Sequence, residues 1–216
     1  MRKNNVTILD YRFGNQFSIT QAFKHLGFNV KTTNDLNEIE NSNFIVLPGV
    51  GAFKSAMSEI KRLKLDKALF NASKRNVPIL GICLGMQLFF DESFEFGKTK
   101  GLGLISGSVR KLPLFSLKKE MLKIPNIGWR KVFRNPNNSD DFIFKSIIEG
   151  EYFYFLHSYS VLPKDERNIV YSFEFGGYKI PAIIKKKNIV GFQFHPEKSS
   201  KKGIELLENY LKQEFH

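Results

Sequence analysis

Cysteine is nearly absent from this sequence of 216 residues, in which Cys83 is the single example. One thiol cannot form a disulfide within the chain, so a small secreted fold held together by disulfides is excluded. The sequence also lacks an apolar N-terminal signal and any apolar run long enough to cross a membrane. We therefore expect a cytoplasmic protein with no membrane partner.

Acidic residues are scarce as well: 21 aspartates and glutamates stand against 33 lysines and arginines, which gives a formal charge of +12. Such an excess makes nucleic acid a partner to consider. The basic residues are scattered, however, and no known nucleic-acid motif organises them. The group Lys185–Lys187 precedes Asn188 and is typical of a hairpin tip between two apolar strands. We expect no nucleic-acid partner.

Histidines, cysteines and carboxylates nowhere show the spacing of metal ligands, so we expect neither a metal nor another cofactor. Internal repeats and low-complexity segments are missing too. A chain of this length suits one domain with a sizeable core, and we expect a single domain over residues 1–216.

Strand and helix patterns alternate in the first half of the chain, and short alternating strands follow in the second half. Strands are expected at Asn5–Asp10, Val30–Thr33, Asn43–Leu47, Leu102–Val109, Tyr152–Val161, Asn168–Phe175, Pro181–Ile184 and Ile189–Phe194, helices at Phe17–Leu26, from about Ala52, at Leu65–Asn76 and at Lys201–Phe215, and a polar loop at Arg134–Asp141. The pattern predicts an α/β fold: a single doubly wound, largely parallel sheet flanked by helices, with additional antiparallel strands in the second half.

The stretch around Cys83 carries the strongest local signal. It lies in Gly81-Ile82-Cys83-Leu84-Gly85, where an apolar strand gives way to a helix expected from Leu84 to about Asp91. A sharp turn between two glycines pushes one side chain out above the sheet edge, as the nucleophile elbow does for serine hydrolases. The helix would point its free N–H groups and its positive dipole end at the sulfur, which favours a reactive thiolate.

Two residues far downstream complete a candidate triad. His195 ends an alternating strand, and Glu197 follows two residues later, so the two side chains can point the same way. Nucleophilic catalysis needs a base within reach of the nucleophile and a third group that orients the base. The sequence therefore predicts Cys83 as the nucleophile, His195 as the general acid and base, and Glu197 as the orienting carboxylate.

These residues belong to segments that resemble the class I (triad) glutamine amidotransferases, and most closely the glutaminase subunits of imidazole glycerol phosphate synthases. The segments are Ile8–Asn15, Leu47–Phe53, the turn around Cys83, Tyr154–Tyr159 and Gln193–Ser199. The resemblance covers the whole expected domain. It implies hydrolysis of glutamine to glutamate and ammonia through a thioester. It also implies a heterodimer with a (β/α)₈-barrel cyclase subunit, which consumes the ammonia in histidine biosynthesis.

The chemistry also requires an oxyanion hole and a glutamine pocket. The backbone N–H of Leu84 is one natural oxyanion donor, and the second, from Val50, is expected in a turn whose glycines let the backbone approach a ligand closely. The resemblance places further residues around the bound glutamine, namely Gly51, Gln87, His157, Ser158 and Tyr159. Because Gln87 lies one helical turn after Cys83, its amide can reach the amino-acid end of the substrate. His157 lies in an aromatic-rich strand and is not expected to be the catalytic base.

Two segments depart from the family pattern where the family faces the cyclase. Arg12 replaces the glycine of Asp-Tyr-Gly, and Pro125-Asn126-Ile127-Gly128-Trp129-Arg130 replaces the usual Pro-His-Met-Gly-Trp-Asn. These departures leave the ammonia acceptor open, because a paralogous glutaminase could instead supply a surface-sugar amidotransferase. The expected docking face comprises Asp10, Arg12, Asn15, Trp129 and Lys198.

Two other activities share part of the pattern. A γ-glutamyl hydrolase or a cysteine peptidase could use the same turn and triad, and would need no synthase partner. A non-catalytic regulatory relative would normally have lost a triad member, and none is lost here.

Overall fold

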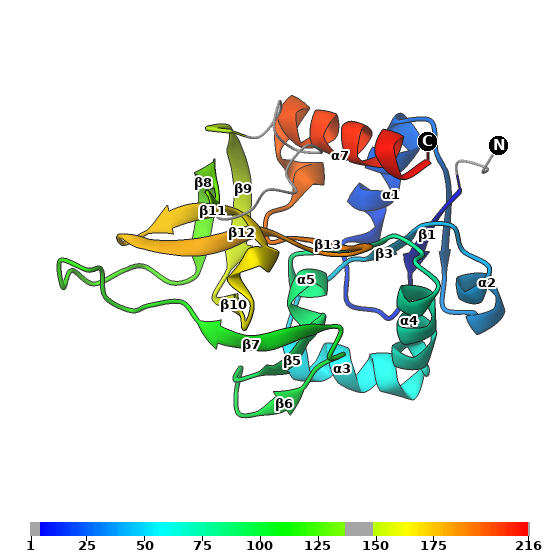
Figure 1. Ribbon diagram of the computed structural model, residues 1–216, viewed down its shortest axis with the longest axis horizontal. Helices are drawn as coiled ribbons and strands as arrows, with labels where there is room; N and C mark the ends of the chain where they lie inside the picture. The colour runs from blue at the N-terminus through cyan, green and yellow to red at the C-terminus, as the bar shows by residue number, and fades with distance from the viewer. Residues whose placement is uncertain (1–4, 137–148, 216) are drawn as a thin grey trace.

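A nine-stranded sheet forms the framework of the computed structural model, which describes residues 5–136 and 149–215 (Figure 1). In spatial order its strands are β2 (Asn29–Thr33), β1 (Asn5–Leu9), β3 (Ile45–Leu47), β4 (Ile79–Ile82), β13 (Ile189–Phe192), β12 (Tyr178–Lys186), β11 (Ile169–Phe175), β8 (Asn126–Arg134) and β9 (Tyr152–His157). Neighbours from β2 to β13 pair in parallel, and those from β13 to β9 pair antiparallel. The predicted fold class is confirmed.

Helices cover both faces of the parallel half of this sheet. They are α1 (Gln16–His25), α2 (Leu36–Glu40), α3 (Phe53–Arg62), α4 (Leu65–Lys74) and α7 (Ser200–Phe215). Helices α1 and α7 pack on one face, and α3 and α4 pack on the other (Figure 1). In β3, Val46 packs in the core between the sheet and helices α1 and α7, whereas Ile45 and Leu47 pack in the core between the sheet and helices α3 and α4. Burial on both faces explains why the central strands are continuously apolar.

Parallel pairing brings the carboxyl ends of β1, β3, β4 and β13 to the same edge of the sheet. Ligand sites of open α/β sheets lie at this edge. The segments that leave the four strands begin at Asp10, Pro48, Cys83 and Gln193. Four motifs that are far apart in the sequence are therefore brought together by the topology.

A second, four-stranded sheet corrects the prediction in two places. Its strands are, in order, β10 (Tyr159–Pro163), β7 (Ile105–Lys111), β5 (Phe90–Ser93) and β6 (Thr99–Lys100). The single strand expected at Tyr152–Val161 is wrong: Ser158 separates β9 from β10, which lie in different sheets. The helix after Cys83, α5 (Leu84–Leu88), ends at Leu88 rather than near Asp91, because the residues that follow pair with β7.

Most other predicted elements are confirmed with small shifts at their ends. The predicted hairpin tip joins β12 to β13, and Lys187 there has a φ of 55°. Strands β5, β6 and β8, helix α2 and the 3₁₀ helices η1 (Glu166–Asn168) and η2 (Pro196–Lys198) were not predicted. Most of the polar loop predicted at Arg134–Asp141 lies outside the described residues. Within the described ranges, no helix is long and apolar enough to span a bilayer.

Candidate active site

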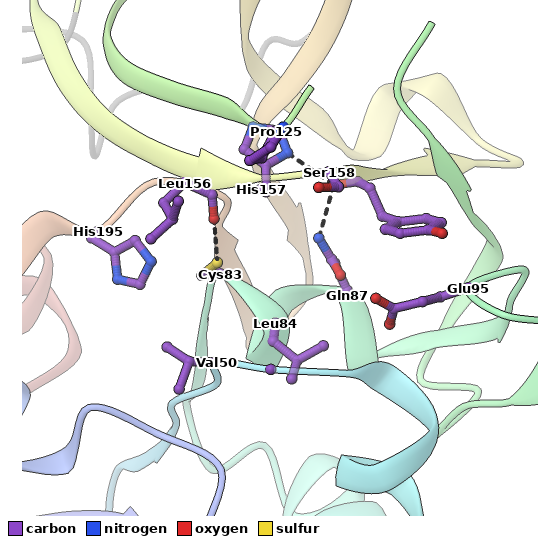
Figure 2. A pocket seen from close by; sticks show the side chains of 12 residues that line it. Val50, Cys83, Leu84, Gln87, Glu95, Pro125, Leu156, His157, Ser158 and His195 are labelled. Atoms are coloured by element: carbon purple, nitrogen blue, oxygen red, sulfur yellow. Dashed lines mark hydrogen bonds between the residues drawn. The ribbon is translucent and has the colours of Figure 1, made fainter. Parts of the chain in front are cut away.

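Cys83 lies in a strained turn between β4 and α5 (Leu84–Leu88). Its backbone has φ 54° and ψ −108°, a conformation that non-glycine residues rarely adopt. The glycine at position 85 is required by packing, since a Cβ there would overlap the carbonyl oxygen of Leu47. The turn holds the Cys83 side chain at a cavity of about 290 Å³ (Figure 2).

His195 and Glu197 reach the same place from the neighbouring strand. Strand β13 runs parallel to β4, and the Cys83 N–H donates to the Phe192 carbonyl at 2.7 Å. Three residues later the His195 ring lines the cavity, and its Nδ1 lies 2.8 Å from Oε1 of Glu197. Its Nε2 is buried and has no hydrogen-bond partner among the described residues. The carboxylate thus holds Nδ1 and leaves Nε2 for the cavity that contains the sulfur.

The electrostatic surroundings favour a protonated His195. Burial alone lowers the pKa of this imidazole, but the Cys83 side chain and the Glu197 carboxylate outweigh burial and raise the pKa to about 10. A protonated imidazole beside the sulfur is the arrangement that supports an imidazolium–thiolate pair.

The two expected oxyanion donors do not converge in this structure. The Leu84 N–H donates to the Gly49 carbonyl at 3.4 Å. Because this carbonyl and the Val50 N–H belong to one trans peptide, the Val50 N–H points away from Leu84. A side chain at position 49 could not be accommodated, since its Cβ would lie 2.6 Å from the Gly85 nitrogen. The Tyr11 hydroxyl, which donates to the Pro48 carbonyl, anchors the preceding peptide.

All residues expected around the glutamine line this cavity, together with three that the sequence did not reveal. The expected ones are Gly51, Gln87, His157, Ser158 and Tyr159, with Val50 and Leu84 beside them. The additional ones are Glu95, Pro125 and Leu156. The Leu156 carbonyl accepts from the Cys83 sulfur at 3.7 Å. No local signal distinguishes Glu95 from its acidic neighbours, because only the path of the chain after β5 brings it to the cavity.

Glu95 supplies a carboxylate beside Gln87. Its Oε2 accepts from the Phe53 N–H at the start of α3, at 2.6 Å. The Gln87 amide nitrogen donates to the Tyr159 carbonyl at 2.9 Å and to the Gln193 side chain at 3.1 Å. Both N–H groups of Gln87 are therefore used within the protein, which leaves its amide oxygen for a ligand. Figure 2 shows Glu95 and Gln87 on one side of the cavity, away from His195.

His157 is a neutral, fully engaged residue in this cavity. Its Nδ1 lies 2.8 Å from the Tyr159 carbonyl, and its Nε2 lies 3.1 Å from the Asn126 amide nitrogen. The Arg130 Nε in turn donates to Asn126 at 2.8 Å, so two departures from the family pattern form one contact. Burial lowers the pKa of His157 to about 4. A ring with both nitrogens engaged orients its neighbours and is a poor candidate for the catalytic base.

The expected docking residues lie on elements around the cavity. Trp129 on β8 is 47% exposed and packs edge-on against Tyr154 of β9. The Tyr154 carbonyl accepts from the His195 N–H, which places β9 against the segment that ends in the exposed Lys198. The other three, Asp10, Arg12 and Asn15, precede α1, which contacts η2. Arg12 is exposed, whereas the Asn15 side chain caps α1 by accepting from the Ser18 N–H.

Comparison with known proteins identifies the family. The glutamine amidotransferase class-I family model matches residues 7–213. The HisH subunit of imidazole glycerol phosphate synthase from Geobacillus sp. (strain WCH70) is 41% identical over 206 residues, 95% of each chain. The HisH subunit from Aquifex aeolicus (strain VF5) is 40% identical over 204 residues, 94% of each chain.

Solved structures share the fold at lower identity. PurLQS from Thermotoga maritima has a TM-score of 0.72 at 18% identity and covers 98% of this chain and 99% of that one. The glutaminase domain of CTPS from Trypanosoma brucei has a TM-score of 0.61 at 15% identity, over 96% of this chain and 94% of that one. Since the family model and the HisH relatives match nearly its whole length, the chain belongs to the class-I glutamine amidotransferase family.

Proposed function

We propose that the protein is the glutaminase subunit of an imidazole glycerol phosphate synthase. In this role it hydrolyses glutamine and passes the ammonia to a (β/α)₈-barrel cyclase subunit in a heterodimer. The proposal rests on the relatives named HisH subunit of imidazole glycerol phosphate synthase, which this chain matches over almost their whole length. The observation that carries the chemistry is the geometry of His195, whose Nδ1 is held by Glu197 while Nε2 is left for the cavity of Cys83.

The reaction follows from these three side chains. The Cys83 thiolate attacks the side-chain carbonyl carbon of glutamine, and the carbonyl electrons move to the oxygen. The His195 imidazolium gives its proton to the leaving nitrogen, so the C–N bond breaks, ammonia leaves and a thioester remains. The neutral imidazole then takes a proton from water, whose oxygen attacks the thioester. Glutamate leaves, and the imidazolium and thiolate are restored.

The amino-acid end of glutamine would lie toward Glu95. An ammonium group needs acceptors, and the Glu95 carboxylate and the Gln87 amide oxygen are two acceptors on one side of the cavity. The substrate carboxylate needs donors, and the Ser158 hydroxyl lines the same cavity. The side-chain amide of the bound glutamine would then extend toward Cys83.

Docking of the partner would face the cavity mouth. The exposed Trp129, Lys198 and Arg12 would take part in this docking, and ammonia released at Cys83 could pass directly into the partner without being protonated in bulk water. The chain has a formal charge of +12, so we expect an acidic surface on the cyclase and association that weakens as salt concentration rises.

Reconstitution with a barrel cyclase tests the proposal. A Cys83→Ala complex should make product from ammonium salt at alkaline pH but not from glutamine, because no other thiol exists to form the thioester. Wild-type protein that hydrolyses γ-glutamyl peptides and ignores the cyclase would overturn the proposal. The second candidate is supply of a surface-sugar amidotransferase, which the departures from the family pattern at Asn126 and Arg130 in the expected docking segment leave open. Stimulation by that synthase alone would establish it.

A further inference from the structure

Gln193 is fully buried beside the candidate nucleophile, although its type and position alone suggest only a strand-end residue. It follows β13, whose Phe192 pairs with Ile82 immediately before Cys83. Its backbone N–H donates to the Ala182 carbonyl at 2.9 Å, so the side chain is held by the sheet. The side-chain nitrogen lies 3.8 Å from the Cys83 sulfur, and the side-chain oxygen lies 3.1 Å from the Gln87 nitrogen.

The direction in which the Gln193 amide points follows from its neighbours. The Tyr159 carbonyl can only accept, so the amide nitrogen of Gln87 must face it. The second N–H on that nitrogen reaches Gln193, which must therefore present its oxygen to Gln87. Only the N–H side of Gln193 is then left for the sulfur. A backbone carbonyl thus determines, through two buried amides, that a donor faces Cys83.

We propose that Gln193 is a positioning residue of the glutaminase reaction: its N–H donates to the Cys83 sulfur while its oxygen holds Gln87. This proposal rests on the glutaminase function proposed above. A donor to sulfur stabilises the thiolate and restricts its rotamer, and the contact weakens when sulfur bonds to the substrate carbon. The same amide contacts both the Cys83 sulfur and Gln87, so it holds the nucleophile in a defined position relative to the residue expected to bind the substrate.

The single thiol makes the test direct, since alkylation of the native chain by iodoacetamide reports on Cys83 alone. Gln193→Met keeps the length of the side chain but removes the donor, and alkylation near neutral pH should slow by about tenfold. Gln193→Glu puts a carboxylate beside the sulfur, and half-maximal alkylation should move up by about one pH unit or more. Gln213→Glu, on the exposed side of α7, makes the same charge change elsewhere and should match the wild type.

A purely structural Gln193 would change the melting temperature without changing the pH profile of alkylation. Superimposable profiles for wild type and a folded Gln193→Met chain would overturn the proposal, and this variant decides the matter even where Gln193→Glu does not fold. The alkylation test needs neither glutamine nor a partner. A chain with altered profiles but no glutaminase activity would therefore contradict the proposed function and leave the Gln193 contact standing. Normal glutaminase activity together with unaltered alkylation profiles in the Gln193 variants would support the proposed function and contradict the Gln193 contact.

Discussion

The backbone N–H of Leu84 donates to the carbonyl oxygen of Gly49 at 3.4 Å, so a carbonyl lies beside one of the two N–H groups that an oxyanion would need. Rotation of the single peptide between Gly49 and Val50 would remove the carbonyl and turn the Val50 N–H inward. Gly49 lacks a side chain that would resist this rotation, and Gly51 has a φ of 96° that glycine adopts without strain. The site is thus one peptide rotation away from two converging donors.

We expect the isolated chain to hydrolyse glutamine slowly and the complex with cyclase and acceptor to be at least about a hundredfold faster, the usual cost of one missing oxyanion donor. Glutamate release measures both rates. Gly49→Ala should lose the stimulation, because its Cβ would lie 2.6 Å from the Gly85 nitrogen. Turnover of the mutant complex with ammonium salt is the control for docking. Full activity of the chain alone would contradict this mechanism.

Substitutions of the histidines and Glu197 should separate their roles. His195→Ala should be about as damaging as loss of Cys83, since both act in the same steps. Glu197→Gln should cost roughly tenfold to ten-thousandfold in kcat, because it weakens the hold on Nδ1. His157→Gln should leave thioester formation largely intact and mainly raise the KM for glutamine. Trapping of the thioester in the complex measures how severe each of these losses is. If thioester formation required His157, the assignment of His195 as the base would be wrong.

Glu95→Gln should raise the KM for glutamine by about tenfold or more with little change in kcat, because in the proposed orientation it removes a charge that would meet the substrate ammonium equally in ground and transition states. The variant keeps an oxygen for the Phe53 N–H, so α3 should remain capped. Glu92→Gln, which affects only the ion pair with Lys98, is the matched control. The proposed orientation of glutamine fails if Glu95→Gln and Glu92→Gln have the same KM.

Stability should fall on both sides of a maximum near pH 6.5, because the two buried histidines are shifted in opposite directions. His195 has a pKa raised to about 10, so its contribution is fully present below about 6.5 and is lost as pH rises toward 10. His157 has a pKa lowered to about 4, so its contribution is present above about 6.5 and is lost as pH falls toward 4.

Urea unfolding of the single variants separates these two effects. His157→Gln should flatten the decline between about pH 6.5 and 4, and Glu197→Gln should weaken the decline between about pH 6.5 and 10. The free energy of unfolding at each pH is the quantity to compare. Unchanged slopes in both variants would show that neither histidine is shifted as described.

Much of the architecture could be predicted from local patterns. Periodicity located α1, α4 and α7, and apolar runs located the parallel strands, because these elements bury regular faces. The boundaries failed where a distant partner decides them. Residues after Leu88 leave the helix to pair with β7. The single strand predicted across Ser158 is divided at that residue, because β9 and β10 pair with strands of different sheets. Such pairings involve residues far apart in the chain, beyond any local window.

The sequence by itself determined the family and the three residues of the candidate triad, because a thiol between glycines and a histidine followed by a carboxylate are rare in combination. Only the tertiary structure decided which groups meet around the cavity of Cys83. Gln193 and the Gly49 carbonyl come from the segments that follow β13 and β3, and Glu95 comes to the same cavity from the loop between β5 and β6. The position of each depends on a hydrogen bond to a distant segment: Gln193 to Gln87, the Gly49 carbonyl to Leu84 and Glu95 to Phe53. The direction of a hydrogen bond depends on the groups that surround it in the folded chain. The Gln193 N–H faces Cys83 because the Tyr159 carbonyl, which is distant in the chain, orients the Gln87 amide.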